Sequence, residues 1–435
     1  MNATCVVITG LKWKILQCPF LDKLLGLLLL IYSNDSSVTF LRYLHISSKV
    51  EVKKIKLAIV IPSSIEMGGG VERWVVNILG AINKDVFDVT LFDTDFFDMK
   101  RFDPEFIEKK LQGIRRIRLR SPDSKFRFMR KTVLLSIILD ILMPLILTLS
   151  RSSERQIKAI KDDYDLVYLA RNSYWRLFKE KTGLFVGSSH AIFSSESRKN
   201  LVFSKLVAAG FFLRKIKVLH VYQGRDKVTD ILKRTKDLFE LPNPVTVTVN
   251  NHQNDGPAKF LFVGRLEKYK GIDLLLEAWK KTNVSDSTLT IIGAGSMKET
   301  IESSINNGNK NIKFLGITDD MELFDEYKKS DVFLYPTRWD SLPTTILEAL
   351  CSGSYILTSE SLKPSFKEEF KLGFMDFFKI TSDDISNKIE KTINNIQNYR
   401  KISNEISSHS LNKYGIESVE KKFEKILRDL VEKYC

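Results

Sequence analysis

Short apolar segments alternate with longer amphipathic segments along most of this 435-residue chain. Residues 56–61, KLAIVI, form a nearly continuous apolar run, which is typical of a strand buried on both faces. In the stretch that follows, Val71, Val75 and Ile78 recur at the spacing of one helix face. Strands that alternate with helices form parallel, doubly wound sheets, so the sequence predicts an α/β fold. Further strands are expected at 89–92, 165–170, 184–187 and 218–221.

The alternation is interrupted once, at 250–257, where the polar and turn-rich stretch NNHQNDGP predicts a linker. A chain of this length is too long for one ordinary domain. We therefore expect two Rossmann-like domains, at 51–249 and 250–410, preceded by an N-terminal extension at 1–50 and followed by a C-terminal helix at 411–435 that could cross back to the first domain. Ligands of such sheets bind at the carboxyl ends of the strands, which places the expected site in a cleft between the two domains. Strands of the second domain are expected at 260–263, 288–292, 312–315, 331–335 and 355–358.

The excess positive charge of the chain lies entirely in its first half. Residues 1–250 contain 41 Lys and Arg against 25 Asp and Glu, whereas residues 251–435 contain 26 against 28. The densest basic stretch is 114–131, IRRIRLRSPDSKFRFMRK. No nucleic-acid-binding module is evident, so the charge suits an anionic membrane surface, a phosphorylated acceptor or simply a solvated face.

Two apolar segments of the first half bear on membrane association. Residues 24–32 are too few to span a bilayer, which takes ~20 residues, and no small-residue cleavage site follows them. They form part of an extension that is either membrane-proximal or the result of a start assigned too far upstream. Residues 133–150 are long enough, but they contain Asp140 and Pro144, which favours a helix at the interface or beneath a neighbour. Four scattered cysteines and five scattered histidines show no disulfide or zinc pattern, so we expect a cytoplasmic protein at the inner face of the cell membrane.

Two cations follow the first strand of the second domain. Arg265 comes directly after the expected strand, and Lys270 precedes Gly271 and the next helix. Cations beside a helix N-terminus suit a diphosphate, to which backbone amides and the helix dipole also contribute. The alternative is a pair of surface cations in a loop. Gly293 and Gly295 follow the next strand and let the backbone approach a ligand, although this pattern alone is weakly specific.

The stretch 338–353, RWDSLPTTILEALCSG, places two carboxylates around the start of a helix. Asp340 lies before the turn, Pro343 suits the first turn of the helix, and Glu348 lies within the helix. Both carboxylates can then face the cleft and accept hydrogen bonds from the hydroxyls of a ligand. The alternative is a capping aspartate and a surface glutamate.

The order GRL-x3-KG, GAG, FLG and YPTRWDSLPTTILEALCSG resembles the nucleotide-sugar domain of glycosyltransferase family 4, a retaining, group 1-type family with the GT-B fold. The resemblance is close over 259–359 and moderate over 56–76, where GGGVER is similar to the first glycine-rich loop of that family. It implies that Arg265 and Lys270 bind the donor diphosphate, Glu348 the ribose and Asp340 the donor sugar. The remaining donor-binding positions that it implies are Gly69, Gly70, Gly293, Gly316, Ile317, Ser341, Leu342, Thr344 and Thr345.

The resemblance also implies a reaction. A hexose would pass, with retention of configuration and without metal or cofactor, from a UDP- or GDP-linked donor to a glycan or polyprenyl-lipid-linked acceptor, and nucleic acid is not an expected partner. Asp340, Arg265, Lys270 and a first-domain histidine are the implied catalytic residues. His190 follows a strand of the right kind and is favoured over His220, which lies inside one.

The chain departs from the family at two positions, which leaves other functions open. Asp340 and Ser341 stand where the family usually has glutamate and glycine. A catalytically inactive GT-B subunit that binds a nucleotide sugar or a partner protein is the main alternative. A GT-B sugar-nucleotide epimerase is a further one, although such enzymes lack the GRL-x3-KG loop.

Overall fold

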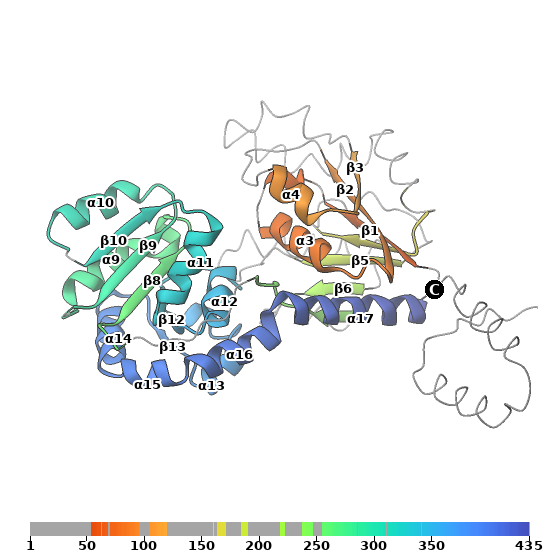
Figure 1. Cartoon of the computed structure of the whole chain (residues 1–435). Coiled ribbons are helices and arrows are strands. Elements are labelled where there is room, and N and C mark those ends of the chain that lie inside the picture. Colours follow the sequence, from red (N-terminus) through yellow and green to blue (C-terminus); the bar gives the residue numbers. More distant parts are fainter. Residues whose placement is uncertain are drawn as a thin grey trace, which may run out of the picture. The chain divides into compact units, whose positions relative to one another are not determined.

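The computed structural model of the chain describes one compact unit within 54–435 (Figure 1). The predicted extension at 1–50 and the apolar segments 24–32 and 133–150 lie outside the described residues. None of the described helices combines the length and the apolar character that crossing a membrane requires. The described residues are 54–61, 63–67, 70–94, 104–119, 160, 163–170, 184–189, 218–221, 237–246, 255–284, 286–309, 311–340 and 342–434.

The first half of the chain forms a parallel sheet in which seven strands are described, in the order β3-β2-β1-β4-β5-β6-β7. All four residues of β4 and the last four of β1 are buried, as expected for strands covered on both faces. Helix α3 (Gly70–Ala81) packs Val75, Ile78 and Leu79 into the core. The strands are β1 (Ile55–Val60), β2 (Phe87–Thr94), β3 (Arg115–Leu119), β4 (Leu166–Leu169), β5 (Leu184–Ser189), β6 (Val218–Val221) and β7 (Asp237–Glu240).

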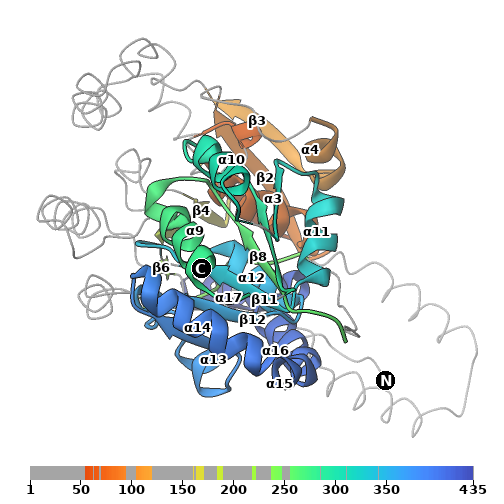
Figure 2. The same ribbon diagram turned by 90° about the vertical axis from the view of Figure 1, so that its left-hand side faces the viewer.

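The second half forms another parallel sheet, in which six strands are described in the order β10-β9-β8-β11-β12-β13. Figure 2 shows β8, β11 and β12 next to one another in this sheet. The strands are β8 (Lys259–Val263), β9 (Thr288–Ile292), β10 (Ile312–Gly316), β11 (Val332–Tyr335), β12 (Tyr355–Ser359) and β13 (Met375–Phe378). The helices are η4 (Lys268–Lys270), α9 (Ile272–Lys281), α10 (Lys298–Asn306), α11 (Asp320–Lys329), α12 (Thr344–Cys351), η5 (Glu360–Leu362), α13 (Lys367–Lys371), α14 (Ser382–Asn394), α15 (Ile396–Lys401) and α16 (Ser403–Tyr414).

Helix α17 (Ile416–Tyr434) follows the second sheet in sequence but packs against helix α3 of the first. The Phe423 ring meets the rings of Trp74 and Tyr168 edge-on, each with a centroid distance of 5.5 Å. The backbone N–H of Asn83 donates a hydrogen bond of 2.5 Å to Glu424 Oε1. The C-terminal helix thus stabilises the first half of the chain through both apolar and polar contacts.

The sequence did not predict β3, for which there is a physical reason. We interpreted 114–131 as a basic stretch, and five of its residues, RRIRL, form this edge strand instead. An edge strand has neighbours on one side only, so it can carry charged side chains where a central strand cannot. Part of the basic stretch is therefore a structural element of the sheet.

Candidate functional site

Lys270 lies in a tight loop at the carboxyl end of β8. The loop closes through η4 and ends at Gly271, whose φ of 77° is in the left-handed region. A Cβ on Gly271 would lie 1.8 Å from the Pro336 carbonyl oxygen, so only glycine fits this close approach. The Arg338 amide also donates a 2.8 Å hydrogen bond to the Tyr269 carbonyl. These contacts bring Lys270 next to the segment that leaves β11.

The Lys270 ammonium is buried in a polar cluster with Tyr335 and Asp340. Only 8% of Lys270 is exposed, and its Nζ donates to the Tyr335 hydroxyl at 2.5 Å and to Asp340 Oδ2. The Tyr335 hydroxyl donates to the same Asp340 oxygen at 2.9 Å. Burial, together with the Asp340 carboxylate, holds the pKa of Tyr335 well above its usual value, so its hydroxyl keeps its proton.

Arg265, the other cation of the proposed diphosphate site, is exposed. Its guanidinium carbon lies 5.3 Å from the centre of the Tyr269 ring. The two cations therefore differ: Arg265 faces solvent, whereas Lys270 is held in a fixed position. The interpretation of both as ordinary surface cations is wrong for Lys270.

Glu348 is buried inside helix α12, with 7% of the residue exposed. The Tyr327 hydroxyl, from α11, donates to Glu348 Oε2 at 2.8 Å. Arg73 Nη1, from α3, lies 3.9 Å from Glu348 Oε1. Burial raises the pKa of Glu348, while Arg73 and the Tyr327 hydrogen bond act to lower it.

The structure contradicts the capping interpretation of these two carboxylates. The N-cap of α12 is Pro343, and no side chain caps the helix there. The Asp340 carboxylate instead accepts from Lys270 and Tyr335, and Glu348 is buried rather than on the surface.

A pocket of about 240 Å³ adjoins Glu348. Its wall includes the cations Arg73 and Lys110 and the carboxylates Asp320 and Glu348, together with apolar side chains. Residues of both halves of the chain and of the segment between the two sheets line it: Arg73, Trp74, Asn77, Phe106, Lys110, Asn243, Pro244, Val245, Thr246, Asp320, Phe324, Thr344 and Glu348.

The other predicted site residues of the second sheet lie at the same strand ends. Gly293 has a φ of 143°, and a Cβ there would lie 1.9 Å from the Gly264 carbonyl oxygen. Gly316 has a φ of 70° and open space beside it, and Ile317, next to it, is 81% exposed. An exposed apolar side chain beside an open backbone suits contact with a flat ligand.

The chain that enters α12 holds the remaining predicted residues of this sheet. Leu342 is buried, and its carbonyl accepts from Asn243 Nδ2 at 3.3 Å. Thr344 and Thr345 are half-buried at the start of α12, and Thr344 lines the pocket. Gly70 is the first residue of α3. Ser341, Gly69 and His190 lie outside the described residues, whereas His220 belongs to β6.

Sequence reasoning missed three side chains of the site: Tyr335, Tyr327 and Arg73. Tyr335 is the last residue of the otherwise apolar strand β11. A hydroxyl at the carboxyl end of such a strand could have indicated a site residue. Arg73 lies in the GGGVER stretch, of which only the glycines had been considered. Tyr327 follows no pattern that distinguishes it from a core tyrosine.

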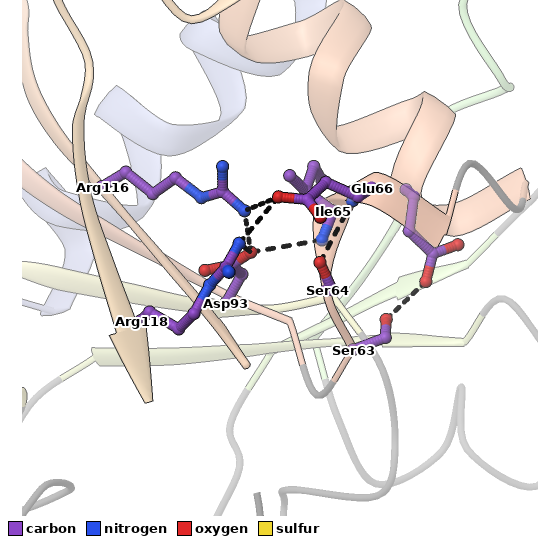
Figure 3. Close-up of polar contacts among 8 residues, drawn as sticks. Ser63, Ser64, Ile65, Glu66, Asp93, Arg116 and Arg118 are labelled. Carbon is purple, nitrogen blue, oxygen red and sulfur yellow. Dashed lines mark hydrogen bonds and ion pairs between the residues drawn. The ribbon is translucent and has the colours of Figure 1, made fainter. Parts of the chain in front are cut away.

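A second polar network lies at the strand ends of the first sheet (Figure 3). Asp93, at the end of β2, accepts from the Ile65 amide at 3.2 Å and from Arg116 Nη2 at 2.5 Å. Arg118 Nη2 lies 2.9 Å from Glu66 Oε1 and 3.7 Å from Asp93 Oδ2. Two arginines of the basic stretch are therefore paired with carboxylates, which reduces the positive charge that this stretch offers to a partner.

Comparison with known proteins gives partial sequence matches. Residues 248–409 match the family described as glycosyl transferases group 1. An uncharacterized 41.2 kDa protein in the cps region of Klebsiella pneumoniae is 31% identical over 156 residues, 35% of this chain and 38% of that protein. D-rhamnosyltransferase WbpZ of Pseudomonas aeruginosa is 30% identical over 142 residues, 32% of this chain and 36% of that enzyme. The chain thus spans well under half the length of these two relatives.

Solved structures are similar over most of the chain. Sucrose-phosphate synthase of Thermosynechococcus elongatus superposes with a TM-score of 0.62 at 15% identity, covering 87% of this chain and 99% of that one. Anabaena Alr3699/HepE in complex with UDP and glucose superposes with a TM-score of 0.58 at 14% identity, covering 86% of this chain and 100% of that one. The predicted two-domain architecture is confirmed: the chain has the GT-B fold, and its residues 248–409 match the family described as glycosyl transferases group 1.

Proposed function

We propose that this protein is a glycosyltransferase that moves a sugar from a nucleoside diphosphate sugar to a glycan or lipid-linked acceptor. The observation that carries the proposal is the hydrogen-bonded cluster of the buried Lys270 and Tyr335 with the half-buried Asp340, which lies with the buried Glu348 at the strand ends of the second sheet. The match to glycosyl transferases group 1 covers these same residues.

The donor occupies the second domain in this proposal. Lys270 and Arg265 bind the diphosphate, because a fixed ammonium and an exposed guanidinium suit adjacent anionic groups. Glu348 accepts hydrogen bonds from the ribose hydroxyls, and the base lies against Gly316 and Ile317. Bound UDP in the similar structure of Alr3699/HepE supports a UDP-linked donor, with GDP as the other candidate.

Catalysis follows from the charge that develops on the leaving group. As the bond between the sugar carbon and the phosphate oxygen breaks, the electron pair leaves with the nucleoside diphosphate. Lys270 and Arg265 stabilise that charge, and donors already in place are usually the largest electrostatic contribution to catalysis. The acceptor hydroxyl oxygen forms the new bond to the sugar carbon, and its proton passes to the departing diphosphate oxygen. Asp340 faces the transferred sugar, whose configuration is retained.

We further propose that the two cations remove the need for a metal ion. Turnover should therefore be the same with and without EDTA. Proton NMR of the product at its anomeric carbon tests retention, which requires the donor and the product to share one configuration.

The acceptor side belongs to the first domain. The net charge of +16 on residues 1–250 supports peripheral binding to an anionic membrane from the cytoplasmic side. One similar structure is a lipopolysaccharide outer core galactosyltransferase, WaaB, with a TM-score of 0.60 at 16% identity, which supports a lipid-linked glycan as acceptor. Co-sedimentation with anionic vesicles should fall in high salt and be small with neutral vesicles. Equal binding to both kinds of vesicle would contradict the electrostatic account.

Calorimetric titration with a panel of UDP- and GDP-sugars tests donor binding. We expect one donor to bind at least tenfold more tightly than its free nucleoside. Absence of binding by every nucleotide sugar would contradict the proposal.

A binding subunit without transfer activity is the second candidate. It is favoured by the direct pairing of Asp340 with Lys270, since that pairing engages both groups before a donor arrives. Tight donor binding without turnover under any acceptor condition would support this candidate over the enzyme.

A further inference from the structure

Tyr335 is held rigidly at the carboxyl end of β11. Its ring is buried and stacks against Phe262 and Phe333, with centroid distances of 5.9 Å in each case. The corresponding interplanar angles are 22° and 21°. Burial and the two ring contacts restrict the ring, so the hydroxyl occupies one position relative to the strand.

The hydroxyl joins two groups that come from different loops. It accepts from Lys270 Nζ at 2.5 Å and donates to Asp340 Oδ2 at 2.9 Å. Lys270 belongs to the loop after β8, and Asp340 to the segment after β11. The Lys270 ammonium also lies 5.1 Å from the centre of the Tyr335 ring. Tyr335 thus links the Lys270 ammonium and the Asp340 carboxylate, which belong to two loops, to a strand of the sheet.

We propose that Tyr335 is a positioning residue for the transfer reaction, through the hydroxyl that sets the relative placement of the Lys270 ammonium and the Asp340 carboxylate. This inference rests on the proposed function. A lysine side chain is flexible, and the Tyr335 hydroxyl is hydrogen-bonded to both Lys270 Nζ and Asp340 Oδ2 from a ring that is itself buried. The hydroxyl accepts from Lys270 and donates to Asp340, so it keeps the two groups in one arrangement in which Lys270 faces the diphosphate and Asp340 the sugar.

Tyr335→Phe is the test, because it keeps the stacked ring and removes only the hydroxyl. Small displacements of reacting groups can cost on the order of 100-fold in rate, so we expect kcat to fall roughly 10- to 100-fold. KM for the donor should change by no more than about threefold, since Arg265 and Glu348 still bind the nucleotide. A general loss of folding would instead lower the amount of active enzyme and leave its kcat per folded molecule unchanged.

Tyr355→Phe is the matched control. Tyr355 is a buried tyrosine at the first residue of the neighbouring strand β12, where it pairs with Val332 at the start of β11, and its ring stacks on Tyr399 at 3.7 Å. The same hydroxyl is removed there from a buried, stacked ring. We expect kcat of this variant to equal that of the wild type.

A double-mutant cycle separates positioning from a general effect. If Tyr335 acts through Asp340, adding Tyr335→Phe to Asp340→Asn should lower kcat by less than about threefold further. The proposal would be overturned if Tyr335→Phe lowered kcat by the full 10- to 100-fold in the Asp340→Asn background. It would also be overturned if Tyr335→Phe alone had the kcat of the wild type. Absence of turnover by the wild type would instead show that the proposed function fails, and the role of Tyr335 in transfer would fall with it.

Discussion

Replacing Glu348 by glutamine tests the proposed ribose site with little structural disturbance. The amide has the shape of the carboxylate, and its oxygen can still accept from the Tyr327 hydroxyl, which lies 2.8 Å from Glu348 Oε2. Burial disfavours the charged form of Glu348, so losing that charge should not reduce the stability of the fold. The variant should fold normally and lose only its charged acceptor.

The expected loss of affinity follows from the bonds involved. A hydrogen bond to a charged group contributes about 1.5–3 kcal/mol, so one lost bond from a ribose hydroxyl should raise the dissociation constant roughly 10- to 150-fold. The competing contact with Arg73 offsets little of this, because Arg73 Nη1 lies 3.9 Å from Glu348 Oε1, beyond hydrogen-bond distance, and the Arg73 side chain is 43% exposed.

Calorimetric titration with UDP and GDP, both lacking the sugar, measures this effect. Glu326→Gln is the matched control, since Glu326 is a buried carboxylate on the neighbouring α11 that pairs with Lys313 at 3.6 Å and Lys329 at 3.3 Å. Its nucleotide affinity should equal that of the wild type. An unchanged affinity in Glu348→Gln would refute the assignment of Glu348 to the ribose.

Other predictions concern charge and pH. Lys270→Ala should weaken binding of UDP or GDP at least about tenfold and leave binding of the bare nucleoside unchanged in the same titration, because its partner is phosphate. Nucleotide affinity should fall as pH decreases through the pKa of Glu348, and since Arg73 lowers that pKa, Arg73→Gln should move the fall to higher pH in titrations between about pH 5 and pH 8. Burial and a hydrogen bond with Glu424 raise the pKa of Glu420 from 4.5 to about 8, so the folded state keeps a proton that the unfolded state loses. The free energy of unfolding should therefore decrease as pH rises between these values, and Glu420→Gln should flatten that dependence in denaturant titrations.

The central strands of both sheets could be predicted from the sequence, whereas among the described edge strands only β10, expected at 312–315, could. Residues 56–61 and 260–263 are apolar because their strands are buried on both faces, and the observed β1 and β8 lie within one residue of the predicted bounds. The strands that were missed, β3, β7 and β13, all lie at an edge of a sheet. Their sequences RRIRL, DLFE and MDFF mix charged and apolar residues, since one side of an edge strand has no neighbour.

The sequence predicted which loops form the site, but it did not predict which side chains contact one another there. The residues of GRLEKYKG and the 338–353 stretch lie at strand ends, and the topology of a doubly wound sheet brings such ends together. No local pattern shows that Tyr335 bridges Lys270 and Asp340, or that Arg73 reaches Glu348, because these contacts join separate loops or separate halves of the chain. The pairing of Arg116 with Asp93 was equally hidden, so the sequence overstated the free charge of the basic stretch.

The release of nucleoside diphosphate from the preferred nucleotide sugar tests the central proposal most directly. The assay compares the wild type with Asp340→Asn, with vesicles that contain a polyprenyl-diphosphate-linked saccharide as acceptor. We predict that the wild type consumes the donor and that Asp340→Asn does so about 100-fold more slowly, while its affinity for the nucleoside diphosphate stays within about threefold. Equal rates for the two proteins, or no release by the wild type from any UDP- or GDP-sugar, would contradict the proposal that this site transfers a sugar.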